Sequence, residues 1–486
     1  MKDMNSDLLW NYRKNGGNRL ENGIRLDYNC MMYENIGLKG IYSGELKNIR
    51  PDMEKAHFNL NEKRKNGEVE WMDIIYGQEE EINEIIELAS SVKQWADTFV
   101  VRGIGGSALG PAAVHHALKH PYYNELPAEK RGGWPKFYVV DNVDPERLSG
   151  LLDIIDIRTT MFNCITKSGN TIETMSQFMI VKDILEKELG KQEAKKHIIC
   201  TTDKTKGALV KTAEKEGYKT FFIPSKVGGR FSELSPVGLL PAACCGIDIK
   251  ELIRGAVSMD KYMAENDVME NPADMYAALS CLALEKGRNI SVIMPYADSL
   301  KLVADWYSQL WAESLGKKYD INGKQKNIGQ TPVRALGATD QHSQMQLFIE
   351  GPDDKIIVII GLDKYKRKIT IPVDSDVEDL GFLRGATHNN MISIEQMSAE
   401  YALLKAGKVN MTITLPEVNE YYLGQLLYMF EVATAFAGEL LNINAFDQPG
   451  VEEGKNAAYA MFGRKGYEAK RAELDAKPEK DKKYII

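Results

Sequence analysis

From about residue 80 onward, short runs of β-branched and aromatic residues alternate with longer stretches whose apolar residues recur at helical spacing. This alternation predicts a mainly parallel sheet covered by helices. A helix is predicted most clearly over 171–189. Strands are predicted in the first half of the chain at 98–103, 136–140, 161–166, 197–200 and 220–224.

The same pattern starts again after residues 246–248. Two long stretches of this half have helical period, 299–316 and 419–442. The second is so apolar all round that it should be a central buried helix. Strands are predicted here at 290–296, 355–361 and 409–416.

The repeated pattern and the length of 486 residues predict two α/β domains that divide near 245–260. No Pro/Ser-rich linker separates them, which favours a tight interface, and clefts between such domains often bind ligands. The expected organisation is an N-terminal arm, a first α/β domain, a second α/β domain and a charged tail, over residues 1–45, 46–250, 251–465 and 466–486.

The charge composition limits the kinds of binding partner that the protein is expected to have. The chain has 61 Lys and Arg against 69 Asp and Glu, a formal charge of −8, and no Lys/Arg-rich run. Nucleic acid or an anionic membrane would on average repel such a protein. A local basic pocket for a small anion remains open.

The six cysteines form no CxxC pair, and most lie in apolar runs. We therefore expect buried reduced thiols rather than a zinc or redox site, and no metal. The N-terminus lacks the apolar region of a signal peptide, and no stretch approaches the ~20 apolar residues of a membrane span. The expected location is cytoplasmic.

A glycine-rich segment, VRGIGGSALG (101–110), follows the first predicted strand and opens a helix. Such a turn exposes backbone N–H groups, and Gly106 and Ser107 stand near the positive helix N-terminus, where an anion could dock. Spacing alone leaves a tight turn equally open. No suitably placed acidic residue supports a dinucleotide fingerprint, since Asp141 lies too far along.

A second turn of this type is TKSGNTIET (166–174). Its hydroxyls, a lysine and the free N–H groups of the next helix make a phosphate cradle, formed by Thr166, Lys167, Ser168 and Thr171. The alternative is that Ser168 and Thr171 only cap the helix. Two such turns in one sheet favour the phosphate interpretation.

Three further segments carry charged groups. Arg230, between a glycine pair and an apolar run, suits stabilisation of an oxyanion, or it is a surface arginine. Glu313 shares a helical stripe with Leu302, Trp306 and Gln309, so it points inward. Loss of hydration makes a carboxylate a better proton acceptor, which suits a general base; a buried ion pair is the alternative.

By the same spacing Lys455 shares a stripe with Val451, Ala458 and Phe462 and is expected to face inward, with snorkelling to solvent as the alternative. His342 lies in a polar segment between Gln341 and Ser343, a setting that the other histidines lack.

With these segments in order, the sequence closely resembles the glucose-6-phosphate isomerase (phosphoglucose isomerase) family, built from two sugar-isomerase (SIS) type α/β domains. The resemblance rests on GIGGSALG, TKSGNTIET, GGRFSELSPVGLLP, QLWAESLGK, ATDQHSQMQL and LLNINAFDQPGVEEGK, which span residues 103–455. Thr166 stands where the family commonly has Ser, and Asn170 where it commonly has Thr.

The resemblance implies reversible conversion of glucose 6-phosphate to fructose 6-phosphate through a cis-enediolate, a step of glycolysis and gluconeogenesis, without metal or organic cofactor. It implies that Glu313 is the base, that Arg230 stabilises the enediolate, and that His342 and Lys455 open the sugar ring. It further implies a homodimer in which the partner subunit supplies the histidine. The implied substrate contacts are Gly106, Ser107, Thr166, Lys167, Ser168, Thr171, Gln309 and Gln448.

Two rival functions fit the sequence less well. An isomerase of glucosamine 6-phosphate usually carries an N-terminal glutaminase with a cysteine near the start, whereas this chain opens Met1-Lys2-Asp3 and its first cysteine is Cys30. A sugar-phosphate sensor could keep the phosphate loops but would not need Glu313, His342 and Lys455 together.

Overall fold

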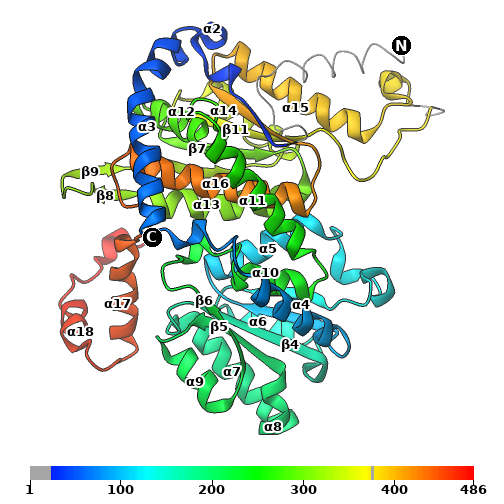
Figure 1. Ribbon diagram of the computed structural model, residues 1–486, viewed down its shortest axis with the longest axis vertical. Coiled ribbons are helices and arrows are strands. Elements are labelled where there is room, and N and C mark those ends of the chain that lie inside the picture. Colours follow the sequence, from blue (N-terminus) through cyan, green and yellow to red (C-terminus); the bar gives the residue numbers. More distant parts are fainter. Residues whose placement is uncertain (1–22, 374–376) are drawn as a thin grey trace.

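The computed structural model describes residues 23–373 and 377–486. Two helix-covered sheets follow one another along the long axis of the molecule, the first in the lower half of Figure 1 and the second in the upper half. Within the described residues, all eight predicted strands are present, with ends within three residues of those expected. The prediction of an α/β protein with mainly parallel sheets is confirmed.

The first sheet has the order β3-β2-β4-β5-β6, and all its neighbours are parallel. Its side chains alternate between two faces, as a strand requires. Phe99 and Val101 of β2 join the core that extends into the second half, whereas Val100 joins a smaller core under α6, α7 and α9. The strands are β2 (Thr98–Arg102), β3 (Lys136–Val140), β4 (Thr160–Thr166), β5 (Ile198–Asp203) and β6 (Lys219–Ile223).

Helices cover both faces of the first sheet. The predicted helix over 171–189 is α7, which starts one residue later, at Ile172. The helices of this half are α4 (Glu79–Lys93), α5 (Gly106–Leu118), α6 (Pro145–Leu152), α7 (Ile172–Leu189), α8 (Lys191–Ala194), α9 (Ala208–Glu216) and α10 (Pro236–Cys244).

The second sheet has the order β1-β12-β11-β7-β10 and is parallel except for its edge strand β1, where Leu26 pairs with Ile413 in an antiparallel register. The sequence pattern did not predict β1 or β10. The strands are β1 (Arg25–Asp27), β7 (Ile290–Pro295), β10 (Thr331–Arg334), β11 (Lys355–Leu362) and β12 (Asn410–Leu415). A separate hairpin joins β8 (Lys317–Tyr319) to β9 (Gln325–Ile328).

The helices of the second half are α11 (Ile249–Glu265), α12 (Pro272–Glu285), α13 (Lys301–Leu315), α14 (Met345–Glu350), α15 (His388–Lys405) and α16 (Glu420–Leu440). Helices from the start of the chain, α2 (Tyr33–Ile36) and α3 (Ser43–Lys65), complete this list. α3 packs against α16 and α12, so residues early in the chain cover the second sheet and not the first.

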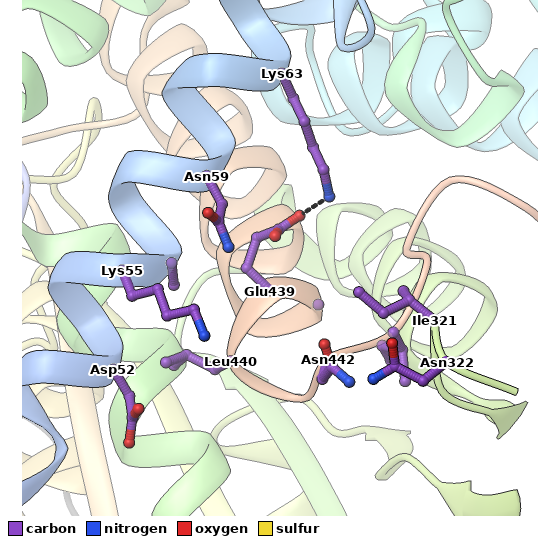
Figure 2. Close-up of a pocket in the computed structure, with 12 residues that line it drawn as sticks. Asp52, Lys55, Asn59, Lys63, Ile321, Asn322, Glu439, Leu440 and Asn442 are labelled. Carbon is purple, nitrogen blue, oxygen red and sulfur yellow. Dashed lines mark hydrogen bonds and ion pairs between the residues drawn. The ribbon is translucent and has the colours of Figure 1, made fainter. Parts of the chain in front are cut away.

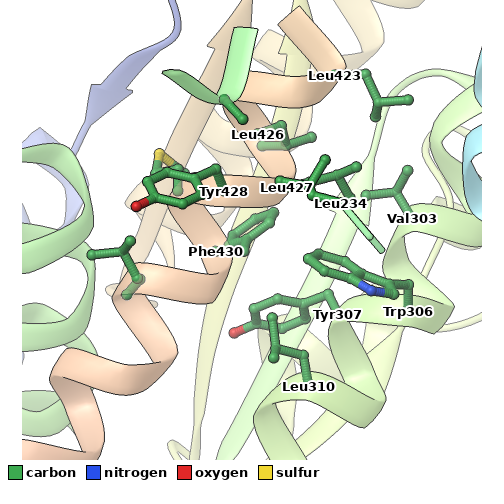
Figure 3. Close-up of a cluster of buried hydrophobic side chains, with 14 of the residues drawn as sticks. Leu234, Val303, Trp306, Tyr307, Leu310, Leu423, Leu426, Leu427, Tyr428 and Phe430 are labelled. Carbon is green, nitrogen blue, oxygen red and sulfur yellow. The ribbon is translucent and has the colours of Figure 1, made fainter. Parts of the chain in front are cut away.

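α16 is the centre of the larger core, as its sequence predicts. Every residue from Leu423 to Gly438 is buried, against α11, α12, α13 and α3. Figure 3 shows its side chains meeting those of α13, where the ring of Phe430 lies 4.7 Å from that of Tyr307. α13 also packs along α5 of the first half. The two sheets therefore share one continuous core, which accords with the missing linker.

The chain ends in a helical hairpin, α17 (Glu452–Met461) and α18 (Glu468–Asp475), which stands off the body at the lower left of Figure 1. All but one of the residues of α17 and α18 are at least partly exposed, the exception being Ala460. Five of the six cysteines are buried and Cys30 is partly buried, all of them as free thiols. Among the described residues, no helix is long and apolar enough to cross a membrane.

Candidate active site

The two turns singled out in the sequence leave the carboxyl ends of neighbouring parallel strands, β2 and β4. This is the edge at which open α/β sheets bind ligands. The glycine-rich turn is compact because its glycines allow close approach. Gly105 has a φ of +56°, and a Cβ on Gly106 would lie 2.1 Å from the carbonyl oxygen of Gly229. The turn is thereby held against the segment that carries Arg230.

Arg230 is a buried residue, and the sequence alternative of a surface arginine is wrong. Its Nε donates to Ser314 Oγ at 2.7 Å, and its terminal nitrogens donate to the carbonyl oxygens of Ala445 and Asp447 at 2.6 and 3.1 Å and to Gln448 Oε1 at 3.2 Å. Burial lowers the pKa of this guanidinium, yet an arginine stays protonated in proteins. Arg230 is thus a fixed positive charge held in one orientation.

Glu313 lies beside that charge. Its Oε1 is 3.5 Å from an Arg230 terminal nitrogen, and its Oε2 accepts a hydrogen bond from Gln309 Nε2 at 2.9 Å. The carboxylate is 26% exposed, whereas Trp306 on the same stripe is buried. Glu313 therefore points toward the protein, as predicted, but at the rim of the buried face where a ligand has access.

The loop after α16 completes this cluster. Lys317 donates to the backbone oxygens of Glu313 and Asp447 at 2.9 and 2.6 Å, and it lies 3.3 Å from the Asp447 carboxylate. Burial lowers the pKa of Lys317, and Asp447 opposes this shift. Residues 445–448 are tied in this way to Arg230 and to α13. The sequence interpretation missed Lys317 and Ser314, although both lie in the QLWAESLGK motif, Ser314 one residue and Lys317 four residues after Glu313.

This arrangement suits proton abstraction next to a carbonyl group. A partly exposed carboxylate is held by one amide, and a buried guanidinium beside it stabilises negative charge that develops on an oxygen.

The second turn forms a cluster of three hydroxyls. Thr166 Oγ1 lies 2.9 Å from Thr171 Oγ1, and Ser168 Oγ lies 3.2 Å from Thr171 Oγ1 and 3.4 Å from Thr166 Oγ1. Thr171 is the N-cap residue of α7, yet no side-chain bond caps that helix. The alternative that these hydroxyls serve only as caps is therefore wrong for Thr171, and the first-turn N–H groups of α7 face the same cluster.

The flanks of this turn are anchored. Lys167 donates to the backbone oxygen of Ser225 at 2.6 Å, and burial lowers its pKa. Asn170 accepts through Oδ1 from the backbone N–H of Ala208, the first residue of α9. Its own carbonyl accepts from Tyr459 of α17 at 3.4 Å. The hydroxyl cluster is thus presented on a rigid turn whose Ser168 is exposed.

Lys455 does not face inward, which corrects the sequence interpretation. Its side chain is 51% exposed and pairs with Glu452 at 2.8 Å. Val451 and Phe462 of the same stripe are 43% and 81% exposed. The prediction that this stripe is buried is wrong because α17 packs mainly on α18. Helical spacing alone did not show which face of α17 would be covered. Lys455 lies one turn before Tyr459, which touches the hydroxyl turn.

His342 is exposed and follows the 3-10 helix Thr339–Gln341. The segment is well anchored, since Gln341 accepts from Tyr296 and donates to Glu395 of α15. Within the described part of the chain, no hydrogen bond or ion pair joins His342 to Glu313 or to the hydroxyl turn. One copy of the chain joins Glu313, Arg230, Gln309 and Gln448 through direct contacts, and within the described residues none of these contacts includes His342.

Ser107 lies partly buried in the first turn of α5, beside the tight contact of Gly106. A buried carboxyl that the sequence interpretation missed lies near the same helix. A Cβ on Gly110 would lie 1.8 Å from Glu233 Oε2, so the fourth glycine of the motif makes room for that side chain. Burial raises the pKa of Glu233 well above its usual value, with a contribution from Glu431.

A separate polar cavity of about 360 Å³ lies between α3, the end of α16 and the β8–β9 hairpin (Figure 2). Lys63 pairs with Glu439 at its wall. None of the predicted site residues lines it within the described ranges. Its wall at Asn442 and Ile443 leads directly into the loop 445–448, so the cavity lies behind the site and is not part of it.

Comparison with known proteins gives the family. The model of the phosphoglucose isomerase family matches residues 88–478. The glucose-6-phosphate isomerase of Carboxydothermus hydrogenoformans is 49% identical over 464 residues, which cover 95% of this chain and 99% of that protein. The enzyme of the same name from Rubrobacter xylanophilus is 45% identical over 80% of this chain and 88% of its own length.

Solved structures agree on the fold. A hypothetical protein from Thermus thermophilus superposes with a TM-score of 0.81 at 35% identity, over 90% of this chain and 99% of that one. A glucose-6-phosphate isomerase from Chlamydia trachomatis gives a TM-score of 0.69 at 23% identity, over 79% of this chain and 73% of that one, and so supports the fold alone. With the family model covering most of its length, the chain belongs to the phosphoglucose isomerase family.

Proposed function

We propose that this chain interconverts glucose 6-phosphate and fructose 6-phosphate, the aldose–ketose step of glycolysis and gluconeogenesis. The observation that carries the proposal is the Glu313–Arg230 pair, 3.5 Å apart, at the same sheet edge as a turn with three clustered hydroxyls. An acid/base carboxylate, an oxyanion-stabilising guanidinium and an anion cradle are the groups that this reaction needs. The 49% identity to a protein of that name supports the substrate.

In this proposal the phosphate binds Thr166, Lys167, Ser168 and Thr171 and the free N–H groups of α7. The sugar lies between that turn and α13, where it contacts the four residues Gly106, Ser107, Gln309 and Gln448. Glu313 removes the proton from C2 of the aldose and returns it to C1, through a cis-enediolate whose negative oxygen faces Arg230. The reverse reaction uses the same groups.

Ring opening needs a proton donor and an acceptor at the ring oxygen and O1, and we assign these roles to His342 and Lys455. Lys455 lies one helical turn from Tyr459, which already contacts the hydroxyl turn, so its amine needs to leave only the exposed Glu452 to reach a bound sugar. Exposed ion pairs such as Lys455–Glu452 contribute only about 0–1 kcal/mol, so breaking this pair to bind the sugar costs little free energy.

We propose a homodimer in which His342 reaches the site of the partner subunit. Two observations support it. His342 is exposed on an anchored segment, and within the described residues no hydrogen bond or ion pair joins it to the Glu313 cluster of its own chain. Around it, Leu347 of α14 and Met391 and Ile394 of α15 expose apolar side chains, by 54%, 38% and 41%. A second copy would cover this surface and complete the site.

The substrate also suggests where the protein acts. Doubly charged sugar phosphates do not cross a lipid bilayer, because a charge is costly to move into hydrocarbon. We infer that the protein works in the cytoplasm, where such metabolites are made and consumed.

The test is a coupled assay. Purified protein is given fructose 6-phosphate in the presence of EDTA, and glucose 6-phosphate is followed through its dehydrogenase. Rapid turnover supports a metal-independent isomerase. Measurable binding of the sugar phosphate without turnover would contradict the proposal and favour a sensor.

A further inference from the structure

Arg102, the last residue of β2, lies in the smaller core of the first sheet. Its side chain is 0% exposed and lies over the rings of Phe162 and Phe178, at 5.1 and 5.9 Å. It points to the face covered by α7, where one terminal nitrogen donates to the backbone oxygen of Gln177 at 2.8 Å. The family motifs in the sequence begin only at the next residue, Gly103, and none of the roles described above falls to Arg102.

This guanidinium has no counter-ion among the residues that the structure describes. No carboxylate forms an ion pair with it, and its Nε and second terminal nitrogen lack hydrogen-bond acceptors there. The polar groups that influence it are the thiols of Cys164 and Cys200. An arginine remains charged in such surroundings, and an unpaired buried charge is strongly unfavourable unless something compensates it.

The hydroxyl turn is a place near Arg102 where a compensating anion fits. Arg102 pairs in register with Cys164 of β4, and Thr166 follows two residues later on the same face, about 7 Å further along the strand. Gln177, which accepts from Arg102, is five residues into α7, about 8 Å from its first turn. Arg102 therefore lies about 7 to 10 Å behind the hydroxyl cluster, with buried side chains between them.

We propose that Arg102 is the fixed countercharge for the phosphate of the substrate and increases its affinity through space, without touching it. This inference rests on the proposed function. A dianion on the turn gains attraction to this charge, reduced by the solvent that reaches the exposed turn. Without a bound phosphate, the charge of Arg102 is uncompensated. The unliganded protein is therefore less stable than a variant with an apolar residue at position 102.

The effect is large enough to measure. A unit charge about 9 Å from a dianion, at an effective dielectric of about 40 to 80, changes the binding constant by about 5- to 20-fold. Shortening a residue that merely shapes the core would lower stability and leave affinity unchanged or lower, whereas removing the Arg102 charge is expected to lower affinity and raise stability.

The experiment uses the full chain with Arg102→Met, which keeps most of the side-chain volume and removes the charge. Inorganic phosphate is the probe, titrated by calorimetry, and KM and kcat are measured for fructose 6-phosphate. We expect phosphate affinity to fall about 5- to 20-fold, KM to rise by the same factor and more than kcat falls, and the unliganded variant to unfold at higher denaturant than the parent. Phe178→Leu, which loosens the same core without changing charge, should unfold earlier and bind phosphate as the parent does.

A second variant protects the test if Arg102→Met does not fold. Gln177→Glu introduces a buried carboxylate at the residue whose backbone oxygen accepts from Arg102, and should also weaken phosphate binding by opposing the positive charge. Parent-like phosphate affinity in the charge-altered variants overturns the inference, as does a joint loss of stability and affinity in Arg102→Met. If the parent neither turns over fructose 6-phosphate nor binds phosphate, the proposed function is wrong. If the parent is active and Arg102→Met has the same activity and phosphate affinity, only the role of Arg102 is wrong.

Discussion

Arg230 and Glu313 lie 3.5 Å apart although they come from different halves of the chain. Arg230 follows the last strand of the first sheet, and Glu313 lies on α13, which covers the second. Four hydrogen bonds hold the guanidinium, three of them from the loop after α16. The site is therefore built where the two halves meet, and each half supplies one of the two charged groups.

Replacing Glu313 by Gln should lower kcat by at least about 10²-fold with little change in KM, because an amide keeps the shape and the contact with Gln309 but accepts no proton. Steady-state kinetics with fructose 6-phosphate measures both constants. Glu193→Gln, which removes a surface carboxylate paired with Lys196, is the matched control and should match the parent. Turnover of Glu313→Gln within tenfold of the parent would remove Glu313 from its role.

Ser168→Ala and Thr171→Ala should mainly raise KM for phosphorylated sugars, since each removes a hydroxyl from the cluster in front of α7. Ser176→Ala is the control, because Ser176 lies on α7 but bonds only to the backbone oxygen of Glu173. KM values that stay at the parent level in both cradle variants would contradict the assignment of the phosphate to this turn.

Gly106→Ala should destabilise the protein by about 1–3 kcal/mol and reduce activity, because its Cβ would lie 2.1 Å from the backbone oxygen of Gly229 and push the glycine-rich turn away from Arg230. Gly150→Ala, inside α6 with no atom within 4 Å of the new Cβ, should stabilise the protein by up to about 1 kcal/mol through helix propensity. Denaturant unfolding of both variants checks the contrast; equal stabilities would refute the steric argument.

His115 should make the protein acid-sensitive. Its ring stacks on Phe137, its Nε2 is buried with no partner in the described structure, and burial lowers its pKa to about 3. Between that value and the unfolded pKa of about 6.5, the unfolded chain binds a proton that the folded chain does not, so stability falls as pH falls.

Its share of the loss between pH 7.5 and pH 5 is about 2 kcal/mol. Guanidinium unfolding of the parent and of His115→Phe at these two pH values isolates this share, because other titrating groups cancel in the difference. The variant should lose about 2 kcal/mol less than the parent. Identical pH dependence in the two proteins would show that His115 titrates normally.

The proposed site shared between two subunits predicts complementation. Glu313→Gln and His342→Asn should each be nearly inactive alone. Mixed, unfolded and refolded in equal amounts, they should recover about a quarter of parent activity, since half of the dimers are mixed and one of their two sites is intact. No recovery in a mixture shown by sedimentation to contain dimers would argue that His342 serves the site of its own chain.

Every strand except β1 and β10 could be predicted in the two sheets, because buried parallel strands read as continuous apolar runs, as in 355–361. α16 was equally clear from its composition. β1 could not be predicted, because its three residues form a strand only by pairing with β12, nearly 400 positions later, and have no strand pattern of their own. Long-range pairing of this kind leaves no local signal.

The site residues likewise differ in how well the sequence predicted their positions. Glu313 and Gln309 were placed correctly by helical spacing because α13 packs against the core on one side. Lys455 was misplaced because α17 packs mainly on α18, and spacing describes a face without saying what covers it. The burial of Arg230 depends on backbone carbonyl groups more than 200 residues later in the sequence. A sequence motif identifies such residues but does not show where they lie in the fold.

The pairing of Leu26 with Ile413 and the packing of α3 on α16 also set an order of events during synthesis. The first sheet lies within residues 98–223 and has all its strands once that stretch has left the ribosome. Residues 25–65 wait longer, since β12 and α16, which pair with β1 and pack on α3, emerge about 390 residues later, roughly 20 to 80 s at 5–20 residues per second. Until then Leu46, Met53 and Leu60 of α3 lack the α16 part of their core, so a segment made early is among the last to complete its packing.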